Sequence, residues 1–562
     1  MSYNQYTNQN SLTNGTFLKN GLLKFDVKKR VFGKFSANET TPNLMRGGVP
    51  LYFSEREKSV YVDYSDSHTL VIGATGSKKS RLFVMPLVKI LGEAGESMIV
   101  SDPKGEVHDR TAGELEKLGY QVQVVNFRDL KKSASWNPLH IPYTCYLAGD
   151  IDRAYEYAND ITENIMKAQV SVKDPYWDNA AADLCYGLIL LLFKYCKEQK
   201  KPRNTVTMEN VLRLRRILFA GLQGDRAKED ISEDLWDYAK SDEIIYAAVS
   251  GTYLNAPVTR NCILSVFDSK MRCFSLQQNL LDMMSSMSLD LDMIAHDISE
   301  NEKTAIFLIM PDEKSGFNSL ISLFIKQSYE YILQKIQNDN HDDVKSLSRR
   351  LNYILDEFSS LPKINDFSSM ITAARSRNIR FNLVIQSKNQ LVHNYDTEAE
   401  TIRSNCMNWV FLTSRELDLL KEISTLCGEK SNGKPLISIA QLQRFDKTKG
   451  ETLVLSGRKQ PCIVQLPDID YYDNKQYKKR YIEDRELTLK LEPLTFEFAT
   501  NDNNQILEGD LHKFVKEHPI NDKDKCYHEL IENRRANDEI VDKLNKINIK
   551  KEDNDTEDDD DN

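Results

Sequence analysis

The amino-acid sequence predicts an α/β protein in which a mostly parallel sheet is interrupted by an all-α segment. Short apolar runs alternate with helical patterns from residue 70 to 127, strand signals nearly vanish between about 148 and 298, and strands resume from 305 to 466. Strands that alternate with helices are typical of a parallel sheet covered on both faces. Neither strand block makes a complete sheet alone, so both are expected to contribute to one domain. The predicted segments are a flexible N-terminal segment (1–45), the first part of the α/β domain (46–147), an all-α domain (148–298), the second part of the α/β domain (299–482) and a charged C-terminal extension (483–562).

The first block begins with Ser59–Tyr64, which alternates like a strand. Apolar runs and helical periodicity then follow each other in the βαβ rhythm. The expected strands are Leu70–Gly73, Met98–Asp102 and Val122–Phe127, and the helices between them are Ser80–Leu91 and Val107–Leu118.

Helical periodicity dominates the middle of the chain and strands return after it. The helices expected in the middle include Trp177–Tyr195, Met208–Phe219, Ile231–Lys240 and Leu280–Met293. The later strands are Ala305–Met310, Tyr353–Asp356, Phe381–Gln386, Trp409–Leu412, Thr452–Leu455 and Cys462–Leu466, and the longest helix between them is Ser319–Gln337. A last helix is expected near Asn521–Asn548, before the acidic tail.

Composition favours an ordinary cytoplasmic protein. Of 562 residues, 40% are hydrophobic and 28% charged. The longest apolar stretch, Leu184–Phe193, is too short to span a bilayer and indicates a buried helix, and the N-terminus lacks the apolar core of a signal peptide. Nine scattered cysteines without a C-x-x-C pair favour reduced thiols over a disulfide framework or a zinc site. The net charge is −10, and the tail from residue 550 supplies about −6 of it, so the body of the chain is only mildly acidic.

The stretch G-A-T-G-S-K-K-S (73–80) follows an apolar strand and opens a helix, which is the arrangement of a phosphate-binding loop. In such a loop, backbone N–H groups surround phosphate oxygens, a Lys reaches the β- and γ-phosphates and a hydroxyl holds Mg²⁺. Lys79 and Ser80 fit these two roles. Lys78 stands where the pattern G-x-x-x-x-G-K-[ST] has Gly, a position where a Cβ is poorly tolerated. The residues expected to contact nucleotide are Gly73, Thr75, Gly76, Ser77, Lys78, Lys79, Ser80 and Arg81.

Two later stretches complete the predicted catalytic site. The strand in L-N-Y-I-L-D-E-F (351–358) ends in two carboxylates, of which Asp356 is expected to orient the Mg²⁺ shell, partly through water, and Glu357 to polarise the attacking water. Gln386 ends another strand and is expected to sense the γ-phosphate. The preceding A-A-R-S-R-N-I (373–379) offers Arg375, and next to it Arg377, as an arginine finger for a neighbouring subunit. V-S-D-P-K-G-E (100–106) is sufficiently explained as a tight polar turn.

In combination these motifs resemble those of the type IV coupling proteins, the hexameric TraG/TraD-like ATPases of conjugation and type IV secretion. The resemblance runs from about residue 45 to 472 and keeps the order and similar separations of the family's motifs. The matching motifs are G-A-T-G-S-K-K-S-R (73–81), S-D-P-K-G-E (101–106), W-N-P-L (136–139), D-P-Y-W-D-N-A-A (174–181), L-D-E-F (355–358) and A-A-R-S-R-N-I (373–379) with Q-S after it.

The resemblance implies a RecA-like P-loop nucleotide-binding domain interrupted by an all-α domain, assembled as a hexameric ring. It implies an ATPase that uses ATP and Mg²⁺ to deliver relaxase-bound DNA to the secretion channel. By position, Lys79 and Ser80 bind the triphosphate and Mg²⁺, Asp356 and Glu357 form the second acidic motif, and Gln386 is the sensor. The implied partners are DNA, a relaxase and relaxosome accessory protein, and the ATPase of the channel, with the helical domain recognising DNA and cargo.

Two departures from the family pattern leave alternatives open. Most relatives begin with transmembrane helices, and this sequence shows none, so we expect a chain recruited to the inner face of the cell membrane by a separate membrane protein. Lys78 either adds a cation beside the phosphates or spoils the loop. A non-hydrolysing adaptor, whose helical domain and acidic tail dock cargo, is therefore one alternative. A DNA translocase of the FtsK/HerA type, acting outside secretion, is the other.

Overall fold

The computed structural model describes residues 19, 21–32, 46–167, 175–223, 229–289, 291–295, 303–311, 315–339, 346–473, 479–484 and 496. By its contacts the chain divides into two units, Met1–Thr495 and Phe496–Asn562. The fold and site described below belong to the first unit. The helix expected near Asn521–Asn548 and the acidic tail lie outside the described residues.

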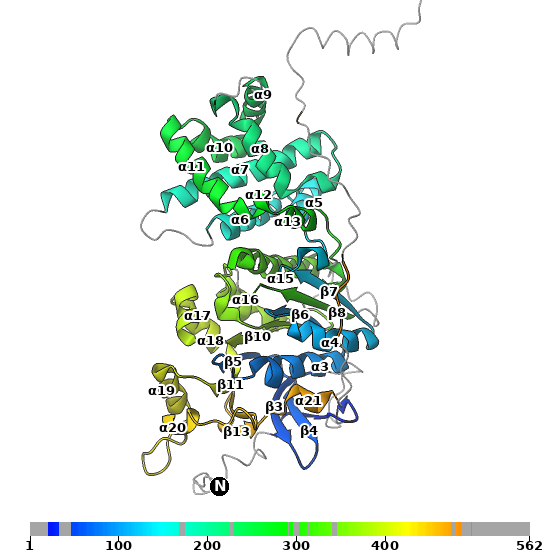
Figure 1. Cartoon of the computed structure of the whole chain (residues 1–562), viewed down its shortest axis with the longest axis vertical. Helices are drawn as coiled ribbons and strands as arrows, with labels where there is room; N and C mark the ends of the chain where they lie inside the picture. The colour runs from blue at the N-terminus through cyan, green and yellow to red at the C-terminus, as the bar shows by residue number, and fades with distance from the viewer. Residues whose placement is uncertain are drawn as a thin grey trace, which may run out of the picture. The chain divides into compact units, whose positions relative to one another are not determined.

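A nine-stranded sheet forms the centre of the first unit, in the order β13-β12-β11-β5-β10-β9-β6-β8-β7 (Figure 1). All neighbours from β11 to β7 are parallel, while β12 and β13 are added antiparallel at one edge. The strands are β5 (His68–Gly73), β6 (Ser97–Asp102), β7 (Tyr120–Asn126), β8 (Lys303–Ile309), β9 (Leu351–Leu355), β10 (Ile379–Ile385), β11 (Cys406–Thr413), β12 (Glu451–Ser456) and β13 (Cys462–Gln465). The predicted α/β class with a mostly parallel sheet is confirmed.

Strands from both halves of the sequence alternate in this sheet. β10 and β9 come from the second block, yet they lie between β5 and β6 of the first block, with Ile72 paired to Ile385 and Val100 to Ile354. One strand, β10, separates β5, which precedes the predicted phosphate loop, from β9, which precedes the two carboxylates. Because parallel strands end at a common edge, this order brings the ends of β5, β6, β9 and β10 together.

Helices cover both faces of the sheet. On one face, α3 (Met85–Ala94) and α4 (Glu106–Lys117) pack on Val71, Val384 and Ile354 in the main hydrophobic core. On the other face, α15 (Asn318–Asp339) and α16 (Phe367–Ala374) place aromatic rings around Phe381 of β10. Strands buried on both faces read as continuous apolar runs, and this is why the sequence revealed them.

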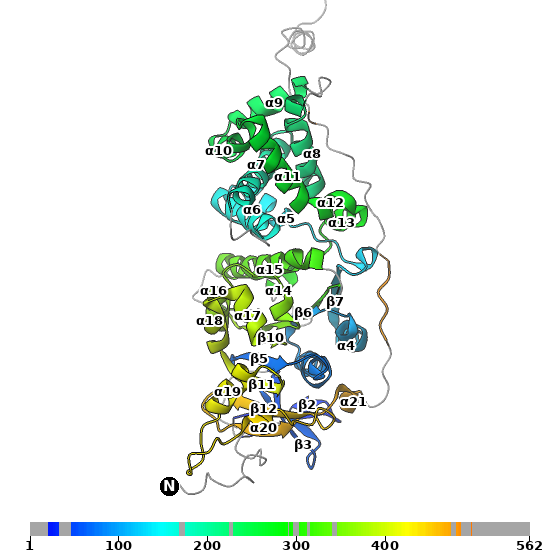
Figure 2. The ribbon, with the colours of Figure 1, turned by 60° about the vertical axis from the view of Figure 1, so that its left-hand side comes forward.

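The remaining helices of the second half flank the strands β10, β11 and β12 or follow β13 (Figures 1 and 2). They are α17 (Lys388–Tyr395), α18 (Glu398–Ser404), α19 (Leu417–Leu426), α20 (Ile439–Leu442) and α21 (Ile469–Tyr472).

A second, antiparallel sheet has the order β2-β1-β4-β3. Its strands are β1 (Leu23–Asp26), β2 (Val31–Phe32), β3 (Val49–Ser54) and β4 (Ser59–Asp63). Only β4 was predicted, and β1 and β2 fall in the N-terminal segment that was predicted to be flexible. β1 pairs with β4 because the alternating Leu23, Phe25 and Val27 enter the core beside α3.

Between β7 and β8 the described residues form helices, as predicted. They are α5 (His140–Ala148), α6 (Ile151–Met166), α7 (Tyr176–Glu198), α8 (Met208–Leu218), α9 (Glu229–Lys240), α10 (Glu243–Tyr253), α11 (Pro257–Lys270), α12 (Arg272–Leu276), α13 (Gln278–Met283) and α14 (Asp292–Ala295). In the described residues, one helix, α7, is long and apolar enough to cross a membrane, and 72% of its apolar window is buried inside the protein.

The prediction of one helix over Leu280–Met293 was wrong. Helix α13 ends at Met283, and the backbone N–H groups of Ser288 and Leu289 donate to Ser135 O, at 3.0 and 3.3 Å. Ser135 N also donates to the Ser288 hydroxyl at 2.8 Å. Serine competes well for such contacts in non-helical backbone, so the apolar periodicity did not decide the structure here.

Side chains of α15 join the helical segment to the sheet. Gln327 accepts from the buried Trp136 indole at 3.2 Å and donates to Pro138 O at 2.9 Å. Lys326, with a side chain 3% exposed, contacts Asp160 of α6 at 2.7 Å and Asp366, the residue before α16, at 3.0 Å. One buried cation thus contacts both the helical segment and the α/β domain.

Candidate nucleotide-binding site

The loop after β5 has the backbone conformation of a phosphate-binding loop. Gly76 and Lys78 both have positive φ, 77° and 65°, so peptide N–H groups turn inward along the loop. Residues 80–84 form one π-helical turn before α3 begins at Met85. The loop is tightly packed, because a Cβ added at Gly73 would lie 2.5 Å from Ser77 Oγ. That hydroxyl is buried and has no hydrogen-bond partner in the structure, as expected of a group that faces a ligand.

Lys79 is held inside the loop. Its Nζ donates to Gly73 O at 2.7 Å, and the residue is 7% exposed. Burial lowers the pKa of Lys79, and the carboxylates of Glu357 and Asp356 oppose that effect. A buried ammonium with one carbonyl partner is ready to exchange that partner for a phosphate oxygen.

Ser80 and Asp356 meet across the strand edge. Ser80 Oγ donates to Asp356 Oδ2 at 2.8 Å, and Asp356 Oδ1 accepts from Glu357 N at 3.0 Å. Burial raises the pKa of Asp356 to about 6, and the neighbouring Glu357 carboxylate adds to this effect. A hydroxyl and a carboxylate oxygen side by side are the hard oxygen ligands that Mg²⁺ prefers, so the predicted metal-site residues fit the ion.

Glu357, Gln386 and Thr75 form a hydrogen-bonded chain. Gln386 Nε2 donates to Glu357 Oε1 at 2.5 Å, and Gln386 Oε1 accepts from the Thr75 hydroxyl at 2.8 Å. Glu357 itself has φ 59°, a left-handed conformation that is costly for a non-glycine residue and frequent at functional sites. The strand-end amide therefore contacts the phosphate loop on one side and the second acidic residue on the other.

The D-P-K-G-E turn, which the sequence interpretation left as an ordinary turn, lines the same site. Asp102 ends β6 and accepts from His108 N at 2.8 Å, and burial raises its pKa to about 7. Lys104 also lines the site, and its main-chain oxygen accepts from Arg128 Nη1 at 2.9 Å. Within the described part of the chain, no carboxylate pairs with Lys104 Nζ. The strand position of Asp102, beside the strand that ends in Asp356, is the signal that could have revealed this turn.

These groups surround one cavity of about 220 Å³. The loop residues 75–81, the turn from Asp102 to Val107, and the trio Asp356, Glu357 and Gln386 line it. Most of the predicted site is therefore brought together in one place. A cavity with a helix start, three lysines and a hydroxyl beside a buried carboxylate suits a polyphosphate with its cation.

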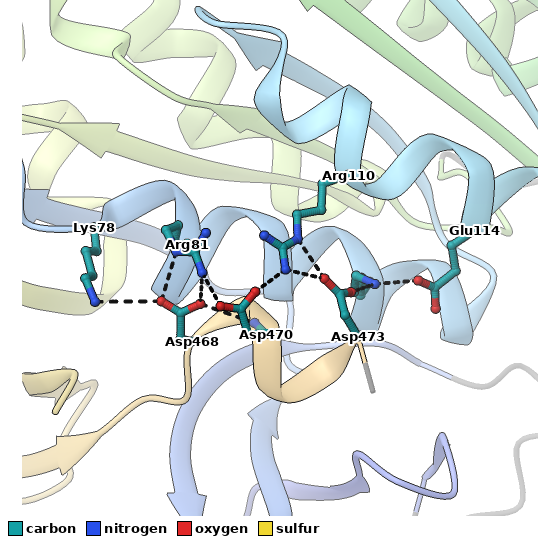
Figure 3. Close-up of polar contacts among 8 residues, drawn as sticks. Lys78, Arg81, Arg110, Glu114, Asp468, Asp470 and Asp473 are labelled. Carbon is teal, nitrogen blue, oxygen red and sulfur yellow. Dashed lines mark hydrogen bonds and ion pairs between the residues drawn. The ribbon is translucent and has the colours of Figure 1, made fainter. Parts of the chain in front are cut away.

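Two of the predicted nucleotide-contacting residues turn toward a neighbouring acidic segment (Figure 3). Lys78 Nζ lies 3.9 Å from Asp468 Oδ2, and Arg81 Nε donates to the same oxygen at 3.0 Å. Both residues also line the cavity. The two alternatives for Lys78, a spoiled loop and an additional cation beside the phosphates, stay predictions.

Arg375 lies far from the chain's own cavity. It precedes β10, whereas Gln386 follows it, and the 7 residues of this strand span about 20 Å. Its Nη2 contacts Asp66 at 3.1 Å on the surface. The structure does not bring Arg375 or Arg377 to the site of the same chain, and a finger for a neighbouring subunit stays a prediction.

Comparison with known proteins agrees with this arrangement. The sequence model of the family described as "Type IV secretory system Conjugative DNA transfer" matches residues 19–454. The chain belongs to this family. Two conjugal transfer proteins TraG of Escherichia coli are similar to it: one is 22% identical over 387 residues (64% of this chain, 55% of the relative), the other 23% identical over 401 residues (66% and 56%). The chain thus spans about half the length of these conjugative DNA transfer proteins.

Solved structures of the plasmid coupling protein TrwB are also similar. TrwB in complex with the GTP analogue GDPNP has a TM-score of 0.48 and 17% identity, covering 74% of this chain and 88% of that protein. TrwB in complex with ADP and Mg²⁺ has a TM-score of 0.47 and 16% identity, covering 75% and 88%.

Proposed function

We propose that the chain is an ATP-driven coupling protein, which delivers relaxosome-bound DNA to a type IV secretion channel. The observation that carries this proposal is one cavity that contains Lys79, Ser80, Asp356, Glu357 and Gln386, in a chain of the conjugative DNA transfer family. Nucleotide binding alone would need only the phosphate loop. The hydrogen-bonded Glu357 and Gln386 beside the loop favour hydrolysis as well.

Each residue has a role that follows from its present contacts. Lys79 exchanges Gly73 O for the β- and γ-phosphates, and Ser80 and Asp356 hold Mg²⁺, Asp356 partly through water. The ion, when bound, neutralises charge on the phosphates. Glu357 accepts a proton from the attacking water. Because Gln386 now donates to Glu357, that hydrogen bond must loosen before the carboxylate faces water, which makes Gln386 suited to sense the γ-phosphate.

Lys104 is proposed as a further phosphate contact. It faces the phosphate loop across the cavity, its charge lowers the pKa of Lys79, and the contact of its carbonyl with Arg128 steadies the turn. A bound triphosphate would separate the two lysines with negative charge. Lys104 then stabilises the same oxygens from the side opposite to Lys79.

The assembly and partners follow from the family and are part of the proposal. The ring is a hexamer in which Arg375, or Arg377, reaches the nucleotide of the next subunit. The helical segment 148–298 acts as a domain that recognises DNA, relaxase or accessory protein, and the ring engages the ATPase of the channel. A separate membrane protein recruits the chain to the inner face of the membrane, and tight binding of the purified chain to protein-free lipid vesicles would contradict that recruitment.

Phosphate release by the purified full chain tests the enzymatic proposal. We expect Mg²⁺-dependent ATP hydrolysis that rises with added single-stranded DNA and with oligomer size. Lys79→Ala should abolish both nucleotide binding and hydrolysis, whereas Glu357→Gln should bind ATP and hydrolyse it at least about 100-fold more slowly. Lys421→Ala, which alters an exposed lysine of α19, is the matched control and should leave the rate unchanged. Equal rates in the wild type, Lys79→Ala and Glu357→Gln would mean that the site does not hydrolyse ATP.

Of the two alternatives, an adaptor without hydrolysis was suggested because Lys78 replaces a glycine of the phosphate-loop pattern. The contact of the Lys78 side chain with Asp468 weakens this argument. Binding of ATP without turnover, with or without DNA, would restore it. The family match favours conjugative transfer over a translocase of the FtsK/HerA type. Loss of plasmid transfer, but not of plasmid maintenance, in cells carrying Lys79→Ala is the expected distinction.

A further inference from the structure

We infer that Asp468 is a positioning residue of the nucleotide site, which holds the phosphate loop in its binding conformation through Lys78. The inference rests on the proposed function, because it concerns the same loop. It explains how a lysine can replace the glycine of the phosphate-loop pattern.

The first observation is the backbone at Lys78. Its φ of 65° lies in the left-handed region, which a glycine adopts freely and which costs another residue about 1–2 kcal/mol. The next peptide leads directly to Lys79, so relaxation of Lys78 to a right-handed conformation would turn that peptide and displace the Lys79 side chain. The Lys78 carbonyl accepts from Leu82 N at 2.8 Å, and a side-chain contact that favours the left-handed conformation would hold the loop further.

Asp468 supplies that contact. Its Oδ2 atom lies 3.9 Å from Lys78 Nζ and 3.0 Å from Arg81 Nε, while its Oδ1 atom pairs with Arg81 Nη2. One carboxylate thus contacts two cations that flank Lys79 and Ser80 in the chain. Figure 3 shows both side chains directed toward Asp468 from the start of the phosphate-loop helix.

The acid is itself fixed in place. Asp468 precedes the short helix α21 and accepts from Asp470 N at 3.2 Å, and the following Ile469 is fully buried. At the other end of α21, Asp473 accepts from Arg110 Nε of α4 at 2.7 Å and pairs with Lys89 of α3. Helices α3 and α4 pack on one face of the sheet. Their contacts with Asp473 therefore fix α21, and with it the Asp468 carboxylate, next to the loop.

Asp470 provides a matched comparison. It contacts Arg81 Nη2 at 2.7 Å and also pairs with Arg110, but it makes no contact with Lys78 in the described structure. Removing the charge of Asp470 therefore disturbs the same acidic segment without touching the residue in the left-handed conformation. Comparing substitutions of Asp468 and Asp470 therefore distinguishes an effect on the loop conformation from an effect on the stability of α21.

The test measures the affinity of the full chain for Mg²⁺ and the fluorescent nucleotide mant-ATP in a double-mutant cycle. Asp468→Asn should weaken binding about two- to fivefold in the wild-type background, the range expected for a partly exposed ion pair. Combined with Lys78→Gly, the same change should weaken binding less than twofold, because glycine needs no partner to keep a positive φ. Asp468→Glu should restore most of the affinity, and Asp470→Asn should leave it within twofold of the wild type.

Thermal midpoints of all variants are measured in parallel, and similar midpoints for Asp468→Asn and Asp470→Asn are expected. Equal losses of affinity from Asp468→Asn with and without Lys78→Gly, or no loss in either, would overturn the inference while nucleotide binding itself stands. Absence of mant-ATP binding in the wild type would instead overturn the proposed function and, with it, this inference.

Discussion

Replacing Asp356, the acid proposed to hold Mg²⁺, by asparagine should stabilise the protein while abolishing the proposed hydrolysis. Asp356 is 3% exposed, and its two carboxylate oxygens accept from Ser80 Oγ and Glu357 N. Asparagine preserves both contacts, since its oxygen accepts from the peptide N–H and the serine hydroxyl rotates to accept from its amide. The substitution therefore removes a buried charge while Ser80 and Glu357 N each keep a hydrogen bond.

The magnitude follows from the pKa of Asp356, which burial raises from 3.8 to about 6. A rise of about two units in pKa corresponds to about 3 kcal/mol by which the ionised carboxyl destabilises the folded chain. The sign depends on pH. Below pH 4 the carboxyl is protonated in both states and costs nothing, and between pH 4 and 6 the folded state holds the proton more tightly, so wild-type stability falls as the pH rises through this window. At pH 7.5 the free energy of unfolding of Asp356→Asn should exceed that of the wild type by this full amount.

The assay is thermal unfolding of wild type and Asp356→Asn without nucleotide at pH 4.5, 6 and 7.5. The variant should unfold about 3 °C higher at pH 7.5, because a chain of this length has a large unfolding entropy, and the two midpoints should converge toward pH 4.5. Added Mg²⁺ and ATP should stabilise the wild type more than the variant. The control Asp418→Asn changes an aspartate side chain that is 93% exposed, and should not shift the midpoint. A less stable variant at pH 7.5, or a gain independent of pH, would refute the reasoning.

Three further predictions concern the loop and its surroundings. Gly73→Ala places a Cβ 2.5 Å from Ser77 Oγ and should weaken mant-ATP binding at least about tenfold, whereas Gly113→Ala in α4 meets open space and should raise the unfolding free energy by about 0.5–1 kcal/mol, with affinity unchanged. Lys104→Ala should raise the KM for ATP in phosphate-release assays, and Lys104→Arg should recover part of the loss. Burial lowers the pKa of His68 to about 4, so its contribution to stability is complete above pH 6.5 and is lost as the pH falls toward 4; His68→Gln should flatten that decline in thermal midpoints.

The sequence was sufficient for the elements of the central sheet and for most of the site. Buried parallel strands give continuous apolar runs, and phosphate chemistry restricts the loop to few residue types, so the sequence singled out Lys79, Ser80 and Asp356, which line one cavity in the structure. The order of the strands was not predictable, because it depends on where each crossover helix returns. Only that order places Gln386 between Thr75 and Glu357.

The missed features are those that depend on contacts distant in sequence. β1 is too short to be recognised alone and exists through its pairing with β4. Asp102 lines the cavity because its strand, β6, lies next to β9, and the D-P-K-G-E motif alone does not reveal this. The direction of the Lys78 side chain follows from its φ and from Asp468, which is 390 residues later in the chain.

The buried Lys326 has a mechanical consequence. Its ammonium holds Asp160 of the helical segment and Asp366 of the loop that starts at Glu357, and both Glu357 and Asp366 have positive φ. Removing one partner from a buried ion pair is costly, so the contact of Asp160 with Lys326 opposes a displacement of α6 relative to α15. Asp160 of the helical segment is therefore connected, through Lys326 and Asp366, to the loop that begins at Glu357, which lines the cavity.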